Sequence, residues 1–139
     1  LRLLEKYAVK IGGGHNHRYN LSDEILIKDN HISAEESLKT LVKKAIRTKK
    51  LVTVEIENIY QLKEINGLKF KRILFDNMNT QQLKKCLKLC KNKYQTEYSG
   101  NATLKNIKTI SKTGVNRISV GEITHSTKSF DASLKFKIS

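Results

Sequence analysis

The chain has 139 residues, enough for one domain with a buried core but too few for a complete eight-unit α/β barrel of about 250 residues. Lysine and arginine outnumber aspartate and glutamate by 27 to 13. A formal charge of +14 is compatible with an anionic partner, such as nucleic acid, an anionic membrane surface or a small polyanion. The basic residues are scattered, however, which favours the alternative that they lie on solvated helix surfaces. No apolar run approaches the roughly 18 residues of a transmembrane helix, so we expect no membrane partner.

The first part of the chain predicts a helix, a loop, a strand and a second helix. Residues 1–11 carry apolar side chains at helical spacing, and a run of three glycines ends that helix. A polar loop over 15–23 leads to a short apolar strand at 25–28. Ser33 and Glu36 have the spacing of a capping box, which predicts a helix starting at Ser33.

Strands and helices then alternate at intervals of roughly 20–30 residues, the size of a βα unit. In chain order, we expect strand 51–57, helix 59–65, strand 72–76, helix 80–91, strand 94–98, helix 103–112 and strand 117–120. Residues 130–138 alternate between apolar and polar side chains and predict one more strand, outside the parallel set. The alternation predicts an α/β fold with a parallel sheet or barrel.

Polar or charged residues follow each strand expected in this parallel sheet. The carboxyl ends of parallel strands share one rim, and active-site residues collect there. The sequence therefore predicts a functional rim that contains Lys28, Glu57, Asp76, Ser99 to Asn101, and Gly121.

Cations gather around the first of these strand ends. Arg18 and His17 lie on the loop that leads into the strand ending at Lys28. Arginine binds planar carboxylates through two parallel bonds and lysine supplies a point charge, so the group can hold a small anion. The alternative interpretation is ordinary surface charge.

Two carboxylates, Glu57 and Asp76, follow adjacent apolar strands. Carboxylates at such a rim can bind sugar hydroxyls, hold Mg²⁺ or stabilise a developing positive charge. Glu55 shares a strand face with Glu57, and we expect one of the two to be buried. The alternative is that these carboxylates form a buried ion pair with Lys28.

Two loops after the last strands are rich in small residues. Ser99, Gly100 and Asn101 precede a helix, and Gly121 with Glu122 follows the final strand. Small residues let backbone N–H groups approach a phosphate, and phosphate sites of barrels use the last βα loops. The two loops together predict a phosphate site.

Cys86 and Cys90 are the only cysteines and lie four residues apart on one predicted helix. We expect them to be small apolar core residues, because a disulfide within one helix has poor geometry. Reduced thiols are typical of a cytoplasmic protein.

At this point the chain resembles quinolinate phosphoribosyltransferase, also called carboxylating nicotinate-nucleotide pyrophosphorylase. The most specific strings are Gly-Gly-Gly-His-Asn-His-Arg over 12–18 and Ile-Lys-Asp-Asn-His over 27–31. Further similarity runs through nearly the whole chain in order, over residues 1–9, 54–57, 75–78, 97–100, 113–115 and 119–126.

The resemblance implies an incomplete TIM-like barrel, with about five βα units, over residues 1–129. It implies that residues 130–139 return to an N-terminal α/β sandwich domain absent from this chain. We therefore expect the chain to be a fragment that has little activity alone. The parent enzyme would be a cytoplasmic homodimer or higher homo-oligomer with sites at the subunit interface.

The resemblance also implies a reaction and residue roles. Quinolinate attacks C1 of phosphoribosyl pyrophosphate, pyrophosphate leaves, and loss of CO₂ gives nicotinate mononucleotide for NAD biosynthesis. By family analogy, His17, Arg18 and Lys28 bind quinolinate, while Glu57 and Asp76 face the ribose and the Mg²⁺ that accompanies pyrophosphate. The phosphoribosyl pyrophosphate phosphates are held by Ser99, Gly100, Asn101, Gly121, Glu122 and Ile123.

Two alternative functions remain open from the sequence. Nicotinate phosphoribosyltransferase has a related barrel and a monocarboxylate substrate, whereas the crowded cations favour a dicarboxylate. A basic nucleic-acid-binding module would use the positive charge, but only 6% of the residues are aromatic and the polar residues gather at one rim. We therefore expect no nucleic-acid partner.

Overall fold

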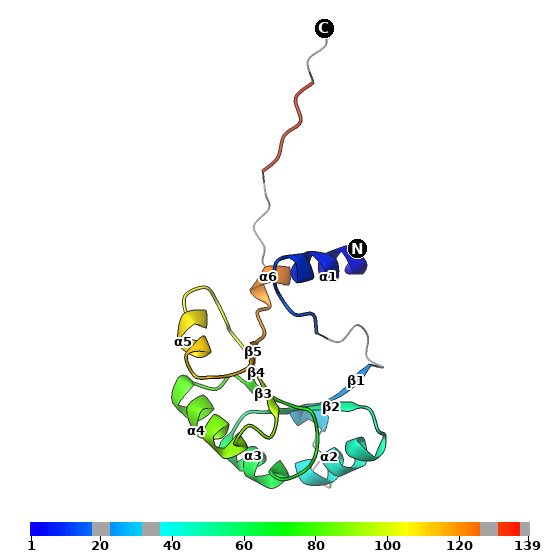
Figure 1. Ribbon diagram of the computed structural model, residues 1–139, viewed down its shortest axis with the longest axis vertical. Coiled ribbons are helices and arrows are strands. Elements are labelled where there is room, and N and C mark those ends of the chain that lie inside the picture. The colour runs from blue at the N-terminus through cyan, green and yellow to red at the C-terminus, as the bar shows by residue number, and fades with distance from the viewer. Residues whose placement is uncertain (18–22, 32–36, 126–130, 137–139) are drawn as a thin grey trace.

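A computed structural model describes residues 1–17, 23–31, 37–125 and 131–136 of the chain. Its centre is one parallel sheet with the strands in chain order, β1-β2-β3-β4-β5 (Figure 1). The strands are β1 (Glu24–Ile27), β2 (Leu51–Ile56), β3 (Arg72–Asp76), β4 (Gln95–Ser99) and β5 (Arg117–Ile118). The parallel α/β fold predicted from the sequence is confirmed, and all strand carboxyl ends lie at one edge.

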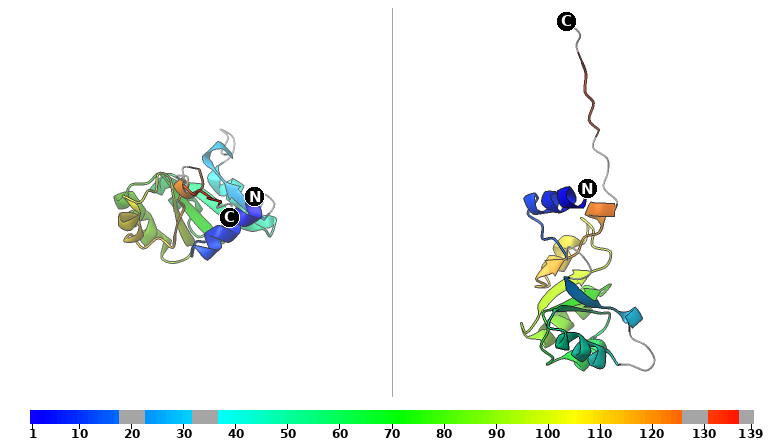
Figure 2. Two further views of the ribbon diagram at one scale, coloured as in Figure 1. Left: turned by 90° about the horizontal axis from the view of Figure 1, so that it is seen from above. Right: turned by 90° about the vertical axis from the view of Figure 1, so that its right-hand side faces the viewer.

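Helices follow the strands and cover one side of the sheet. They are α2 (Leu38–Arg47), α3 (Ile59–Ile65), α4 (Thr80–Cys90) and α5 (Ile107–Ser111), with a short 3₁₀ turn at Asp29–His31 after β1. The first and last helices, α1 (Arg2–Ile11) and α6 (Glu122–His125), lie together on the opposite side of the sheet from α2–α4 (Figures 1 and 2). Every helix in the described residues is too short or too polar to cross a lipid bilayer.

Alternate residues of each strand face opposite sides of the sheet. In β2, Val52, Val54 and Ile56 are buried in the hydrophobic core beneath the helices. Thr53 and Glu55 therefore point to the other side, which we call the inner face. The register continues this face across the sheet, because Thr53 pairs with Arg72. The core packs the helices, and the inner face is left for polar side chains.

Cys86 and Cys90 are both free thiols buried in this core, as the sequence predicts. Burial, with a further contribution from Cys86, raises the pKa of Cys90 to about 11. A thiol that stays protonated is a poor nucleophile and metal ligand, so these cysteines serve packing.

Two helices begin later in the structure than the sequence predicts. Helix α2 begins at Leu38 with Ser37 as its N-cap, later than predicted. Ser33 and Glu36 of the predicted capping box both lie outside the described residues. Ser37 accepts a hydrogen bond from the Thr40 N–H, which gives it the capping role. Helix α5 begins at Ile107, later than predicted, because Asn106 caps the preceding turn by accepting from the Thr103 N–H.

The predicted C-terminal strand is not formed over residues 131–136, which have no regular structure and are exposed. A strand needs a neighbour to satisfy its backbone groups, and these residues lie apart from the sheet (Figure 2). Leu134 and Phe136 expose large apolar surfaces. Their packing on another domain stays a prediction.

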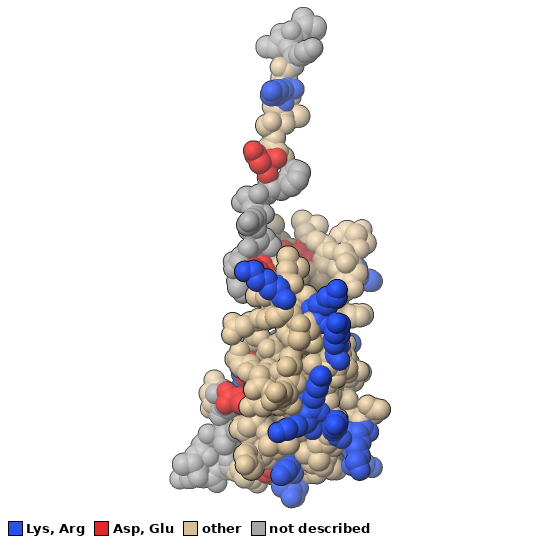
Figure 3. Space-filling view, turned by 90° about the vertical axis from the view of Figure 1, so that its left-hand side faces the viewer, with Lys and Arg blue, Asp and Glu red and all other residues tan. Residues whose placement is uncertain are grey.

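Many of the positive charges lie on the outer helices and on the turns next to them. Figure 3 views the molecule from the side of α4 and α5 and shows lysine and arginine spread over that face. The exposed lysines of this region are Lys84, Lys85, Lys88, Lys91, Lys93, Lys105, Lys108 and Lys112. They lie on the solvated surfaces of helices and turns rather than at the rim.

Candidate active site

The strand ends predicted to carry function lie at one edge of the sheet. Lys28 directly follows β1 and Glu57 directly follows β2, while Asp76 and Ser99 are the last residues of β3 and β4. Asp76 and Ser99 are partners in the ladder. Ile56 pairs with Phe75, which brings Glu57 level with Asp76. The predicted rim is thus formed, with its carboxylates side by side in register.

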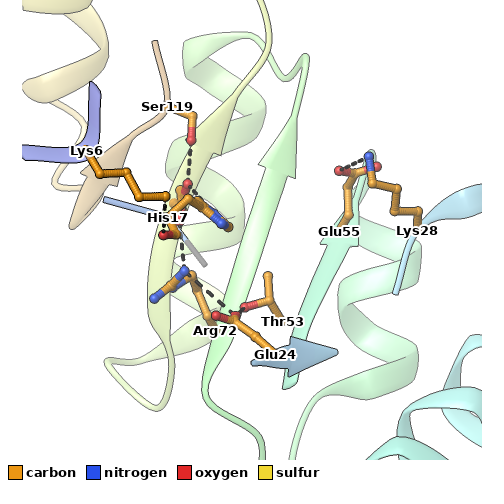
Figure 4. Close-up of polar contacts among 9 residues, drawn as sticks. Lys6, His17, Glu24, Lys28, Thr53, Glu55, Arg72 and Ser119 are labelled. Atoms are coloured by element: carbon orange, nitrogen blue, oxygen red, sulfur yellow. Dashed lines mark hydrogen bonds and ion pairs between the residues drawn. The ribbon is translucent and has the colours of Figure 1, made fainter. Parts of the chain in front are cut away.

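Lys28 forms its ion pair with Glu55 and not with the rim carboxylates. The Lys28 Nζ lies 3.8 Å from the Glu55 Oε2, and the Glu55 side chain is largely buried on the inner face (Figure 4). Glu57 is exposed at the rim. Of the two glutamates on this face, Glu55 is therefore the buried one and Glu57 is the one open to a ligand.

His17 is held over the inner face by Glu97. Its Nε2 lies 3.2 Å from the Glu97 Oε1, and its side chain remains 38% exposed (Figure 4). The segment carrying it is tied to α1, because Lys6 Nζ donates to the His17 carbonyl and Asn16 donates to the Lys6 carbonyl. Arg18, predicted to bind the same anion, lies outside the described residues.

Beneath His17 lies a buried charged cluster that the sequence analysis did not identify. Arg72 places its Nη1 3.3 Å from the Glu97 Oε2 and 3.8 Å from the Glu24 Oε1. Thr53 donates to Glu24, and Ser119 donates to Glu97. One guanidinium is therefore shared between two buried carboxylates.

Strand alternation is the signal that could have revealed this cluster. Arg72 lies four residues before Asp76 and Glu97 lies two before Ser99, so each shares a strand face with a rim residue. A charged residue on the same face as a functional strand end is a candidate for its support.

Acid should weaken the fold through Glu97. Burial by itself raises the pKa of Glu97, but hydrogen bonds from His17 and Ser119 and the charges of His17 and Arg72 bring that pKa below its usual value. Because the folded pKa is lowered, the stabilisation is present above the unfolded pKa of about 4.3 and is lost as pH falls through the folded value. Urea unfolding at several pH values should show a steeper loss below about pH 5 for the wild type than for Glu97→Gln. Parallel curves would contradict this linkage.

An asparagine chain joins the β3 loop to the β4 loop. Asn101 Nδ2 donates to Asn77 Oδ1 over 3.2 Å, and Asn77 Nδ2 donates to Asp76 Oδ2 over 2.8 Å. The Asn77 N–H also donates to the Ser99 carbonyl over 2.9 Å. The Asp76 carboxylate is therefore oriented by the same loop that precedes α5. Asn77 was not singled out from the sequence.

The second predicted phosphate loop follows β5. Gly121 is exposed, and its carbonyl accepts bonds from the Thr124 N–H and hydroxyl. Glu122 and Ile123, which start α6, are exposed as well. Both loops thus follow strands at the same edge of the sheet as Asp76.

A hollow of about 530 Å³ lies at the other end of β3 and β4. The residues that line it are Gly67, Leu68, Lys69, Phe70, Lys93 and Tyr94. Phe70 stacks on Tyr94, whose hydroxyl donates to the Leu68 carbonyl. None of the predicted rim residues contributes to this hollow.

The sequence model described as quinolinate phosphoribosyl transferase, C-terminal domain, matches residues 1–135. The chain belongs to this family. The structure of NadC from Streptococcus pyogenes superposes with a TM-score of 0.90 at 39% identity, covering 98% of this chain and 49% of that one. The nicotinate-nucleotide pyrophosphorylase of Francisella tularensis gives a TM-score of 0.82 at 39% identity, covering 88% of this chain and 45% of that one. The chain therefore has the same fold as the matched half of each of these solved proteins.

The chain is also similar in sequence to curated members of this family. The probable carboxylating nicotinate-nucleotide pyrophosphorylase of Bacillus subtilis is 44% identical over 142 residues, which cover 100% of this chain and 49% of the relative. The chloroplastic carboxylating enzyme of Arabidopsis thaliana is 39% identical over 156 residues, covering 97% of this chain and 45% of the relative. The present chain thus spans about half the length of the curated relatives it matches.

Proposed function

We propose that the full-length protein transfers the phosphoribosyl group of phosphoribosyl pyrophosphate to quinolinate. The quinolinate nitrogen bonds to C1 as the bond to pyrophosphate breaks, and loss of CO₂ then gives nicotinate mononucleotide for NAD biosynthesis. The single observation that carries the proposal is the rim itself. In a chain of this family, cations, carboxylates and small-residue loops meet at one edge of a parallel sheet.

The cations at the β1 end suit the dicarboxylate. His17 and Lys28 both reach the inner face, where His17 is paired with the buried Glu97 and Lys28 with the partly buried Glu55. Arg18 adds a third cation by the resemblance. Each charge-assisted hydrogen bond contributes about 1.5–3 kcal/mol, so two or three of them distinguish two carboxylates from one.

The carboxylates of Glu57 and Asp76 suit the reacting ribose. Positive charge develops on the sugar as pyrophosphate leaves, and two carboxylates level in register can stabilise it. Carboxylate oxygens also fit Mg²⁺, which uses one or two carboxylates together with substrate phosphates. When bound, Mg²⁺ neutralises charge on the leaving pyrophosphate.

The loops after β4 and β5 suit the phosphate groups of phosphoribosyl pyrophosphate. Gly100 is half-buried with a positive φ of 95°, which lets the backbone of the Ser99–Asn101 loop turn without a side chain in the way. We assign the 5′-phosphate and pyrophosphate to this loop and to Gly121, Glu122 and Ile123. The excess of lysine on the outer helices would raise the local concentration of these anionic substrates.

Decarboxylation needs little chemistry from the protein. Once the ring nitrogen is bonded to ribose, its positive charge stabilises the electron pair left on the adjacent ring carbon as CO₂ leaves, and a proton from water then bonds to that carbon. The protein then contributes chiefly by holding the two substrates in line and by excluding wrong orientations. This is consistent with a site made of binding groups.

The carboxylating activity named for the relatives favours quinolinate over nicotinate as the substrate. We further propose a cytoplasmic homo-oligomer. The buried free thiols support the location, and the apolar side chains that α1 exposes support an additional interface. These side chains are Leu3, Leu4, Tyr7 and Ile11.

A direct assay tests the function. The full-length protein is incubated with quinolinate, phosphoribosyl pyrophosphate and Mg²⁺, and nicotinate mononucleotide is quantified by chromatography. We expect product that depends on both substrates. Absence of product with quinolinate, together with turnover of nicotinate, would overturn the proposal.

A further inference from the structure

Glu97 is the most enclosed acidic group beside the proposed quinolinate site. Only 2% of the residue is exposed, yet it does not reach the rim, and the proposed reaction assigns it no contact with substrate. Its two oxygens are shared among His17, Ser119 and Arg72. Burying a carboxylate costs desolvation energy. A buried glutamate next to a binding site is therefore a candidate for a role in that site.

Two cationic side chains, His17 and Arg72, contact the Glu97 carboxylate in the described part of the chain. Arg72 of β3 is the common partner of Glu97 and of Glu24 on β1, so two carboxylates share one guanidinium. Arg117 on β5 is the ladder neighbour of Glu97, but it forms no ion pair with Glu97 in the described part of the chain. Lys6 of α1 contacts the His17 carbonyl rather than the carboxylate.

The contact with Glu97 determines which ring nitrogens of His17 carry a proton. A carboxylate 3.2 Å from Nε2 requires a proton on that nitrogen. In a neutral ring the other nitrogen would then carry a lone pair, which repels a carboxylate ligand. Only the imidazolium form donates at both nitrogens, to Glu97 on one side and to a ligand on the other.

We propose that Glu97 is a positioning residue of the quinolinate site, which orients His17 and balances its imidazolium charge so that the second ring nitrogen donates to a substrate carboxylate. The inference rests on the proposed function. It assigns the buried cluster to substrate recognition rather than to folding alone.

The test compares Glu97→Gln with the wild type in the full-length protein. The substitution keeps the shape and removes the charge. At pH 8 we expect the KM for quinolinate to rise about tenfold or more, with kcat and the KM for phosphoribosyl pyrophosphate within about twofold.

Glu64→Gln is the matched control. Glu64 accepts a bond from the Lys39 N–H over 2.9 Å on the outer helices, and glutamine can keep that bond. This control should leave both KM values unchanged. If Glu97→Gln behaves like Glu64→Gln, or weakens the use of both substrates equally, the positioning role is wrong.

A second variant covers failure to fold. Glu97→Asp keeps the charge and withdraws it from His17 by one methylene. A smaller rise in the quinolinate KM alone is expected, and no change would overturn the proposal. A wild-type enzyme that makes no nicotinate mononucleotide would instead refute the proposed function, which separates the two failures.

Discussion

Replacing Lys28 with alanine should raise the KM for quinolinate roughly tenfold to hundredfold. This range corresponds to the loss of one charge-assisted bond of about 1.5–3 kcal/mol. The change also removes the cation that lies 3.8 Å from the Glu55 carboxylate. The KM for phosphoribosyl pyrophosphate should stay within about twofold, because its proposed contacts lie at the ends of β2 to β5. Steady-state kinetics with each substrate varied in turn gives both values.

Lys43→Ala provides the control for Lys28→Ala. Lys43 is exposed on α2, so this change removes the same charge from the outer surface. It should alter neither KM by more than about twofold, since exposed charges are screened by solvent. Equal losses for both substrates in Lys28→Ala would contradict the assigned role of Lys28.

Replacing Gly100 with alanine should damage both the β4 loop and the use of phosphoribosyl pyrophosphate. A Cβ at this position would lie 2.1 Å from the Asn77 Oδ1 and 2.9 Å from the Asn77 backbone nitrogen. Asn77 must then move, and with it the bond that orients Asp76. We expect a loss of about 1–3 kcal/mol in the free energy of unfolding. The KM for phosphoribosyl pyrophosphate should rise about tenfold or more, as one charge-assisted contact is lost.

Gly114→Ala separates the backbone strain from the collision. Gly114 has a φ of +90°, close to the +95° of Gly100, but a Cβ there would meet no atom within 4 Å. This variant should lose about 1 kcal/mol of stability and keep its kinetic constants. The measurements are urea unfolding and steady-state kinetics. If the two alanine variants behave alike, the contact between Gly100 and Asn77 has no special role.

The parallel sheet could be predicted because its strands and helices are encoded in local sequence patterns. The alternation of short apolar runs with helical segments is local, and α3 (Ile59–Ile65) and β3 (Arg72–Asp76) have the predicted bounds. Because parallel strands must place their carboxyl ends together, the rim of Lys28, Glu57 and Asp76 followed from the same pattern. The start of α2 did not, because serines stand at both 33 and 37, and the capping-box spacing favoured the first while Ser37 is the N-cap of the helix in the structure.

The strand-end rim and its list of residues were therefore determined by the sequence itself, since local periodicity sets both the strands and their ends. Only the tertiary structure decided which side chains meet beneath the rim. His17 and Glu97 form an ion pair although they are 80 residues apart in the sequence. Lys28 pairs with Glu55 and not with Glu57. Those pairings depend on strand register and on the depth of each side chain on the inner face, which the pattern of one strand does not contain.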